Sequence, residues 1–262
     1  MAIFNKAHAG RRAAIGLVMA MLLTACGSGE PAPIRGQKPT VAVSPTPAAV
    51  SGSALTIPSA VMSEEEAQEN AERLVRKLSL DEKVFLMVEG YMDIRETLRY
   101  FPEGKEMSES TEGRIPESMD SLMTVRDVVN ESYAPVIADG ADRVMMTITS
   151  FPKISAMITP AFMSYEVVSS LLRTELRFDG VIYTPPLDDY RLAKRYPDDT
   201  DGYLAVEAVK AGCDVIYRPK DKGRAAQALR IAVNTGNMSE DRINASVVRI
   251  MKSMYLRGQK TL

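Results

Sequence analysis

Side chains that commonly carry chemistry are scarce in this chain. Of its 262 residues one is His, His8, two are Cys, Cys26 and Cys213, and none is Trp. A catalytic triad with an imidazole base, or a metal site with His ligands, therefore has no candidate residue beyond position 8. We expect neither a cofactor nor a metal ion, and any catalysis in the body of the chain would use other groups.

The two cysteines have different explanations, and Cys26 lies at the end of an export signal. Basic residues near the start precede an apolar run over 13–23, which is too short for a comfortable transmembrane helix; the basic residues are Lys6, Arg11 and Arg12. The next residues, Leu-Thr-Ala-Cys, resemble the lipobox of bacterial lipoproteins, in which the cysteine thiol takes a diacylglycerol. We predict that 1–25 is a lipoprotein signal peptide and that Cys26 is lipidated. An ordinary signal peptide with a chance cysteine is the alternative.

Composition changes after Cys26. Residues 26–60 are rich in Pro, Ala, Ser, Gly and Thr, without apolar periodicity. Such a segment cannot bury enough surface to offset its ordering entropy, so we predict a disordered spacer between membrane and domain. Residues 61–262 form the predicted domain, with Cys213 as its single cysteine and therefore no internal disulfide. The formal net charge of −2 gives no indication of a nucleic-acid partner, which requires clustered Lys and Arg.

Apolar strand patterns alternate with amphipathic helix patterns from 61 onward. The predicted helices are 64–78, 122–137, 164–176, 204–211, 222–233 and one capped by Ser239; the predicted strands are 84–88, 143–148, 180–184 and 214–217. This alternation predicts an α/β fold with a parallel sheet covered by helices. The pattern alone leaves open an open doubly wound sheet or a (β/α)8 barrel, which usually takes about 250 residues.

Several segments resemble a known enzyme family. The stretch 159–164 (TPAFMS) and the stretch 171–184 (LLRTELRFDGVIYT) are similar to glycoside hydrolases of family 3, and most of all to their β-N-acetylglucosaminidase branch. Four flanking segments match the family in order: 78–83 (LSLDEK), 138–145 (ADGADRVM), 208–214 (AVKAGCD) and 239–250 (SEDRINASVVRI). The resemblance implies a (β/α)8 TIM-type barrel and a retaining glycosidase.

The resemblance also locates the catalytic positions, and they have changed. The family nucleophile is an Asp at the tip of strand seven; its position here is Pro185, within Thr184-Pro185-Pro186-Leu187. The family's Asp-His pair for proton transfer falls on Ser110 and Glu112. The family's Lys-His pair, which binds the substrate, is replaced by Arg99 and Tyr100. We expect these two residues to bind substrate.

Three carboxylates are candidate substitutes for the lost groups. Glu112 could act as a general acid if its pKa were raised. Asp188 and Asp189 follow Pro185 closely enough to approach the same opening of the barrel. The alternative for all three is that they are ordinary solvated loop acids, and we favour that interpretation.

A deletion accompanies these replacements. Only Met92 to Leu98 separates the first-strand candidate from the Arg99 motif, too few residues for a βαβ crossover, which takes at least about ten to twelve. We therefore expect an incomplete barrel in which strands one, five, six, seven and eight are recognisable. Its open sheet edges would favour self-association or docking on a protein partner.

Three functions follow from these expectations. The first is a catalytically inactive domain that binds peptidoglycan, another GlcNAc-containing glycan or a protein partner at the cell envelope. The second is an active β-N-acetylglucosaminidase that uses Glu112 with Asp188 or Asp189. The third is a structural lipoprotein. In all three the chain is exported and held at the membrane by the lipid on Cys26.

The lipid anchor gives a first testable prediction. Cys26→Ser should abolish acylation and leave an uncleaved or mis-cleaved precursor, because no other thiol is present near the apolar run. Labelling with palmitate in a bacterial host measures this, with Cys213→Ser as the control that keeps its label. Incorporation of label into the Cys26→Ser variant would contradict the lipobox interpretation.

Overall fold

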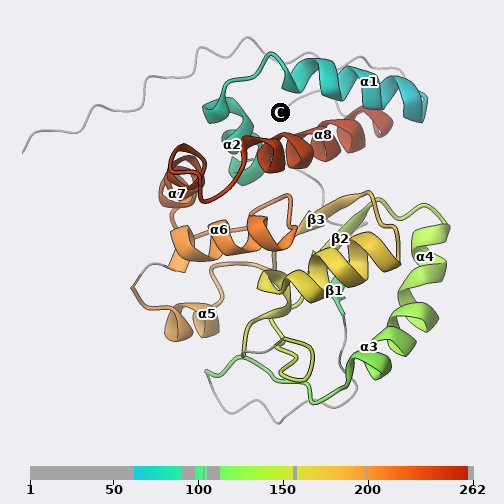
Figure 1. The fold of residues 1–262 in the computed structure, drawn as a ribbon, viewed down its shortest axis with the longest axis vertical. Helices are drawn as coiled ribbons and strands as arrows, with labels where there is room; N and C mark the ends of the chain where they lie inside the picture. The colour runs from blue at the N-terminus through green and yellow to red at the C-terminus, as the bar shows by residue number, and fades with distance from the viewer. Residues whose placement is uncertain are drawn as a thin grey trace, which may run out of the picture. The chain divides into compact units, whose positions relative to one another are not determined.

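Three short strands lie among helices in the part of the chain that the structure describes. The computed structural model describes residues 62–89, 98–102, 104, 113–155, 158–198 and 200–258, all within one compact unit that spans 51–262. Cys26 and the predicted segments 1–25 and 26–60 lie outside the described residues. Figure 1 shows the strands flanked by helices that come from both ends of this unit.

The strands form a parallel sheet in the order β1 (Leu98–Phe101), β2 (Arg143–Met146) and β3 (Val181–Tyr183). Both β2 and β3 are buried along their whole length, as is usual for parallel strands covered on both faces. They lie within the predicted strands 143–148 and 180–184. The predicted strand 214–217 forms only one parallel bridge, between Tyr183 and Val215.

Helix α8 (Glu240–Leu256) carries the apolar stripe expected from the sequence. Ser239 caps it by accepting the backbone N–H of Arg242 at 3.2 Å. The stripe is fully buried and consists of Ile243, Val247, Ile250, Met251 and Met254. Helix α1 (Glu64–Val75) lies along α8 (Figure 1) and begins with a capping box formed by Ser63 and Glu66. These two helices therefore bring the start and end of the described chain together.

Most of the remaining helical segments occupy the predicted positions with some shifts in their bounds. They are α3 (Leu122–Val128), the π-helix η1 (Val129–Tyr133), α4 (Ala134–Ala138), the short 3₁₀ helix η2 (Ala161–Met163), the π-helix η3 (Glu166–Glu175), α5 (Tyr190–Arg195), α6 (Thr200–Ala211) and α7 (Lys222–Asn234). Segments η2 and α5 lie outside the ranges predicted as helical.

The predicted first strand, 84–88, is wrong because this segment belongs to helix α2 (Leu80–Glu89). Ser79 and Glu82 form a capping box: the Glu82 carboxylate accepts the Ser79 N–H at 2.8 Å, and the Ser79 hydroxyl accepts the Glu82 N–H at 3.3 Å. Such a box starts a helix at the next residue. A continuous apolar run does not by itself distinguish a strand from a buried helix, and Phe85, half exposed, marks the outer face of the helix.

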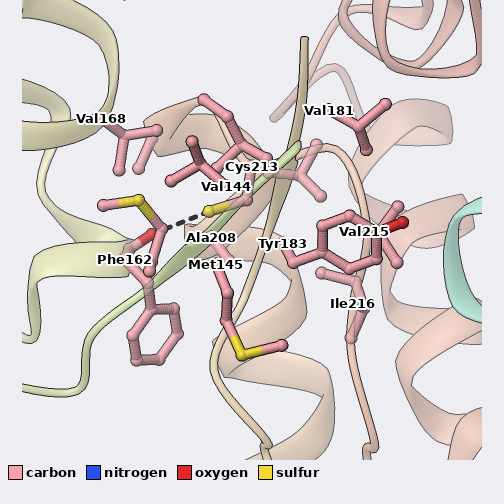
Figure 2. Packing of buried hydrophobic residues seen from close by; sticks show 14 of the residues in the cluster. Val144, Met145, Phe162, Val168, Val181, Tyr183, Ala208, Cys213, Val215 and Ile216 are labelled. Carbon is pink, nitrogen blue, oxygen red and sulfur yellow. Dashed lines mark hydrogen bonds between the residues drawn. The ribbon is translucent and has the colours of Figure 1, made fainter. Parts of the chain in front are cut away.

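Apolar side chains fill the space between the sheet and the helices, as Figure 2 shows. Val144 and Met145 of β2 lie among residues from β3, η2, η3 and α6. Cys213 is part of this core, and its thiol donates to the Phe162 carbonyl oxygen at 3.4 Å. Burial raises the pKa of the Cys213 thiol far above its usual value, so the thiol is unreactive.

None of the helices in the described ranges is long and apolar enough to cross a membrane. Within the same ranges, His, Cys, Asp and Glu side chains form no group of three or more that could hold a metal ion.

The turn before β3 gives a second prediction, which concerns Gly180. A Cβ added there would lie 2.2 Å from the backbone oxygen of Asp142 and 2.5 Å from the Phe178 ring, so Gly180→Ala must push β3 away from β2. We expect a loss of several kcal/mol of unfolding free energy, measured by urea denaturation.

Gly236→Ala is the matched control for that variant. Gly236 has a φ of +74° and nothing within 4 Å of an added Cβ, so this variant should lose only about 1–2 kcal/mol for the left-handed backbone. Equal losses in the two variants would show that the close contact at Gly180 has no part in stability.

Candidate functional site

The carboxyl ends of the parallel strands meet at one edge of the sheet, where the catalytic positions were expected. Hydrogen bonds tie neighbouring strand ends together: Thr147 N–H donates to the Phe101 oxygen at 3.0 Å, and Thr184 N–H donates to the Val215 oxygen at 2.9 Å. We call this edge the mouth and define it by the segments 101–102, 147–150, 184–189 and 217–218.

Pro185 lies at the mouth immediately after β3, and it is buried. The preceding Thr184 is fully buried, and its hydroxyl accepts the Tyr217 N–H at 2.8 Å. Leu187, also fully buried, donates its N–H to the Tyr217 oxygen at 3.0 Å. The segment is therefore fixed on both sides of Pro185, with no side-chain oxygen at position 185.

Asp188 and Asp189 lie beside this segment, and each pairs with an arginine. Asp188 pairs with the exposed Arg218. Asp189 caps α5: its carboxylate accepts the Arg191 backbone N–H at 2.9 Å and the guanidinium Nε and Nη2 at 3.0 and 2.7 Å. These hydrogen bonds from Arg191 lower the pKa of Asp189 despite its partial burial, so it stays ionised and is unsuited to donate a proton.

Of four other residues named from the sequence, two lie outside the described residues and two are described by their backbone alone. Ser110 and Glu112 lie outside the described residues. Arg99 and Tyr100 lie within β1, whose end reaches the mouth, but their side chains are outside the described part of the structure.

A loop hydrogen-bonded to the mouth holds a buried carboxylate that the sequence patterns did not single out. Asp120 is 3% exposed and accepts the Ser118 hydroxyl at 2.6 Å. Ser118 in turn donates its N–H to the Ser150 oxygen at 2.9 Å, which joins this loop to the one after β2. Thr147 and Thr149 share a further hydroxyl hydrogen bond at 3.0 Å. The Ser-x-Asp spacing was the only sign in the sequence, and it is common in ordinary turns.

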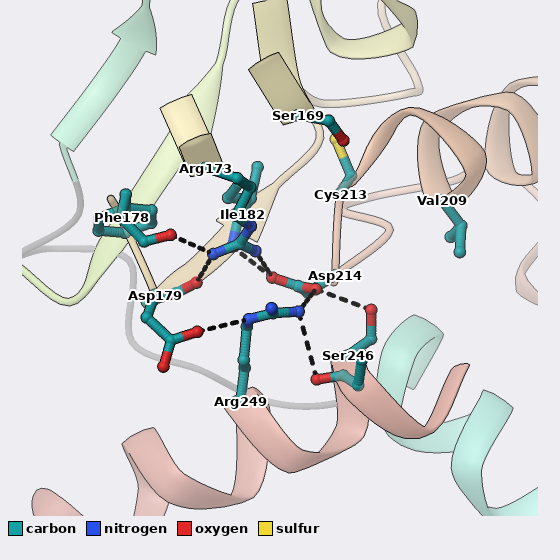
Figure 3. A network of polar contacts seen from close by, with 12 residues as sticks. Ser169, Arg173, Phe178, Asp179, Ile182, Val209, Cys213, Asp214, Ser246 and Arg249 are labelled. Atoms are coloured by element: carbon teal, nitrogen blue, oxygen red, sulfur yellow. Dashed lines mark hydrogen bonds and ion pairs between the residues drawn. The ribbon is translucent and has the colours of Figure 1, made fainter. Parts of the chain in front are cut away.

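A second polar cluster surrounds Asp214 beside β3, as Figure 3 shows. Asp214 is fully buried; its carboxylate accepts the Ile182 N–H at 3.0 Å and the Ser246 hydroxyl at 2.7 Å, and pairs with Arg173. Arg242 and Arg249 lie 3.5 and 3.6 Å from the same carboxylate.

Three arginines surround the single buried carboxylate of this cluster. Burial disfavours the ionised form of Asp214, but the arginines, Arg173 first, outweigh burial and lower the pKa. Arg173 also donates to the Phe178 and Gly180 oxygens at 2.9 and 2.6 Å. The cluster thus joins η3, the turn before β3 and α8, which is a structural role.

A cavity of about 340 Å³ lies beside this cluster, at the amino ends of β2 and β3. Charged side chains line it in pairs: Arg249 bonds Asp179 at 3.1 Å, and Lys252 bonds Glu64 at 2.9 Å. It lies at the other end of the strands from Pro185.

Comparisons with known proteins identify the family. Residues 62–253 match the model of the glycosyl hydrolase family 3 N terminal domain, so the chain belongs to this family. That domain is an α/β fold of the TIM-barrel type, and the few parallel strands among many helices are consistent with an incomplete barrel.

Individual relatives agree with this assignment. A family 3 β-N-acetylglucosaminidase from Paenibacillus sp. str. FPU-7 superimposes with a TM-score of 0.56 at 30% identity, over 63% of this chain and 32% of the other. A β-glucosidase C from Emericella nidulans is 35% identical over 36% of this chain and 16% of its own length. A protein described as an uncharacterized secreted glycosyl hydrolase, from Arthroderma benhamiae, is 28% identical over 63% of this chain and 48% of its own. The chain thus spans less than half the length of these relatives.

The Asp214 cluster gives a third prediction. Asp214→Asn keeps the shape but removes the charge that balances the buried Arg173, so we expect a loss of about 3–5 kcal/mol in unfolding free energy. Asp179→Asn is the control, because its exposed carboxylate pairs with Arg249 and Lys252 near the surface and should cost at most about 1 kcal/mol. Equal losses of unfolding free energy in the two variants would show that the buried charge of Asp214 contributes no more to stability than the exposed charge of Asp179.

The same carboxylate predicts how stability depends on pH. Since the pKa of Asp214 is lower in the folded chain than in the unfolded one, its stabilisation is present above the unfolded pKa, about 3.9. It is lost as the pH falls through the folded pKa. Denaturation at a series of acidic pH values should therefore show that the unfolding free energy falls more steeply with pH in the natural chain than in Asp214→Asn. Parallel curves of unfolding free energy against pH would contradict this prediction.

Proposed function

We propose that the chain is a catalytically inactive family 3 domain that binds a cell-wall glycan, or a partner, at the envelope. The observation that carries the proposal is Pro185: the residue at the nucleophile position is buried, is held by its neighbours, and offers no oxygen to attack an anomeric carbon. A retaining glycosidase forms a covalent bond to a carboxylate at this place. Without that carboxylate the covalent route is lost.

The neighbouring carboxylates support the same proposal. Both Asp188 and Asp189 are engaged by arginines, and the bidentate pairing of Asp189 with Arg191 resists reorientation toward a substrate. A general acid needs a raised pKa, whereas that of Asp189 is lowered.

The length of the chain between α2 and β1 adds a further argument. Only residues 90–97 separate these elements, fewer than the ten to twelve or so that even one inserted βαβ crossover would take. The segments with which the family orients the sugar ring therefore have no room here. Orientation accounts for roughly 7–11 kcal/mol of catalysis at its upper range.

The glycan and the location are inferred from relatives. The structure matched at 30% identity is a β-N-acetylglucosaminidase, and we propose GlcNAc-containing glycans, peptidoglycan first, as the ligand. A secreted relative accords with export, and we propose anchoring through the lipid on Cys26. The predicted self-association through open sheet edges remains a proposal beside glycan binding.

A fourth prediction tests catalysis directly. The full chain should not release p-nitrophenol from p-nitrophenyl β-N-acetylglucosaminide, and Pro185→Asp should stay at background, because a carboxylate alone restores neither proton transfer, worth about 10²–10⁴-fold, nor orientation. Circular dichroism shows whether the variant folds. Turnover by the natural chain that Glu112→Gln abolishes would instead establish an active enzyme with a relocated acid.

Binding separates the two inactive alternatives. Titration of the full chain with soluble muropeptides should give a saturable isotherm. An absence of binding to muropeptides and to chitooligosaccharides would favour the purely structural lipoprotein.

A further inference from the structure

The cavity of about 340 Å³ at the amino ends of β2 and β3 is lined by four separate segments. The start of α1 contributes Glu64, the turn before β2 contributes 137 and 140–142, the turn before β3 contributes 177–180, and α8 contributes its last turns. The volume lies in the range of small-molecule sites, about 300–1,000 Å³. These segments therefore form one concave surface that is large enough for a small ligand.

Arg177, in the wall of this cavity, has a backbone conformation that is unusual for its residue type. It follows the end of the π-helix η3, and its φ of +52° places it in the left-handed region. Glycine usually occupies this place after a helix, because a Cβ makes the left-handed conformation costly. Backbone strain of this kind is typically retained where a side chain has a function. The strain therefore points to a role for the guanidinium.

The guanidinium of Arg177 is exposed, and it makes no hydrogen bond or ion pair with any other residue that the structure describes. The other two cations of the cavity wall each have a carboxylate partner. Arg249 bonds Asp179 at 3.1 Å (Figure 3), and Lys252 bonds Glu64 at 2.9 Å. Within the described wall, Arg177 is thus the cation whose charge no carboxylate matches.

The region around the cavity carries more positive than negative charge among its described residues. Asp142, the third carboxylate of the wall, accepts the Ser253 hydroxyl at 2.7 Å and Arg257 Nε at 3.0 Å. Behind the wall, three arginines surround Asp214. With Arg177 added, guanidinium and ammonium groups outnumber the carboxylates here, and such a concave surface attracts an anion.

We propose that this cavity binds the carboxyl end of a short peptide, with the terminal carboxylate on Arg177. A guanidinium holds a carboxylate through two parallel hydrogen bonds. The carboxylates of Glu64 and Asp179 are 78% and 66% exposed, and they accept hydrogen bonds from the backbone N–H groups of the peptide. Apolar side chains complete the wall and contact an apolar side chain of the ligand; they are Ile137, Ala141, Phe178 and Leu256.

Other anions fit this wall less well. A phosphate carries up to two negative charges, so Glu64 and Asp179 repel it more strongly than they repel a carboxylate. A fatty acid has no N–H group for these two carboxylates, and its chain would remove them from water without a hydrogen bond. A peptide end matches the cation, the acceptors and the apolar wall together. Because the cavity and Pro185 lie at opposite ends of the strands, this inference is independent of the proposed glycan binding.

The test is calorimetric titration of the full chain with N-acetyl-alanyl-leucine, which contains no sugar. We expect saturable binding of the free acid, and binding at least about tenfold weaker for its C-terminal amide, because the amide lacks the charge-assisted pair. Arg177→Gly should weaken the Kd for the acid by a similar factor. The same variant should not lower the urea midpoint, because glycine accepts the left-handed backbone.

Arg218→Gly is the matched control. Arg218 is also an arginine in the left-handed region, with a φ of +49°, but it lies at the mouth and not in the cavity wall. Its replacement should leave the Kd for the acid within about twofold of that of the natural chain.

Each outcome supports or overturns the inference. An absence of saturable binding, equal binding of the acid and the amide, or an unchanged Kd in Arg177→Gly would overturn the site. Hexanoate that bound as tightly as the peptide would overturn the peptide end in favour of a simple fatty acid. If Arg177→Gly lowers the urea midpoint, Arg177→Gln takes its place: weaker binding of the acid in that variant supports the site, and unchanged binding overturns it.

Discussion

The carboxylate of Asp214 is completely buried and depends on three surrounding arginines, Arg173 foremost, to remain ionised. A buried charge costs several kcal/mol unless partners surround it. Here the partners come from η3 and α8, and the carboxylate also accepts the Ile182 N–H of β3. Because one group makes all of these contacts, they fix η3, α8 and β3 relative to one another.

This arrangement shows how the domain can keep the family fold independently of the residues at the family's catalytic positions. The Asp214 cluster draws on residues 173, 214, 242, 246 and 249, all in segments that match the family in order. The mouth instead has Pro185 in place of a carboxylate, and its acids serve as a helix cap and a surface ion pair. Structural and catalytic requirements are met by different residues, so the second set can change while the first persists.

Sequence patterns predicted most of the helices, because capping residues and apolar stripes act locally. Ser239 and the stripe of α8 are where the pattern placed them. Segment 84–88 was assigned as a strand because an apolar run fits both structures; the Ser79–Glu82 box just before it would have decided the question. The resemblance located Pro185, Asp188 and Asp189, but the pairing of these acids with Arg218 and Arg191 depends on tertiary contacts. The Asp214 cluster arises from segments brought together only by folding, which is why no local pattern indicated it. For the buried Asp120 the only local sign was the Ser-x-Asp spacing.

The central claim is that no carboxylate in this domain can form a bond to a sugar. The most direct measurement is the intact mass of the full chain after incubation with a 5-fluoro-N-acetylglucosaminyl fluoride, whose ring fluorine slows hydrolysis of a glycosyl–enzyme and makes it accumulate. An active family 3 β-N-acetylglucosaminidase under the same conditions is the control. The account predicts an unchanged mass for this chain. A mass increase of one glycosyl group, on any Asp or Glu, would contradict it.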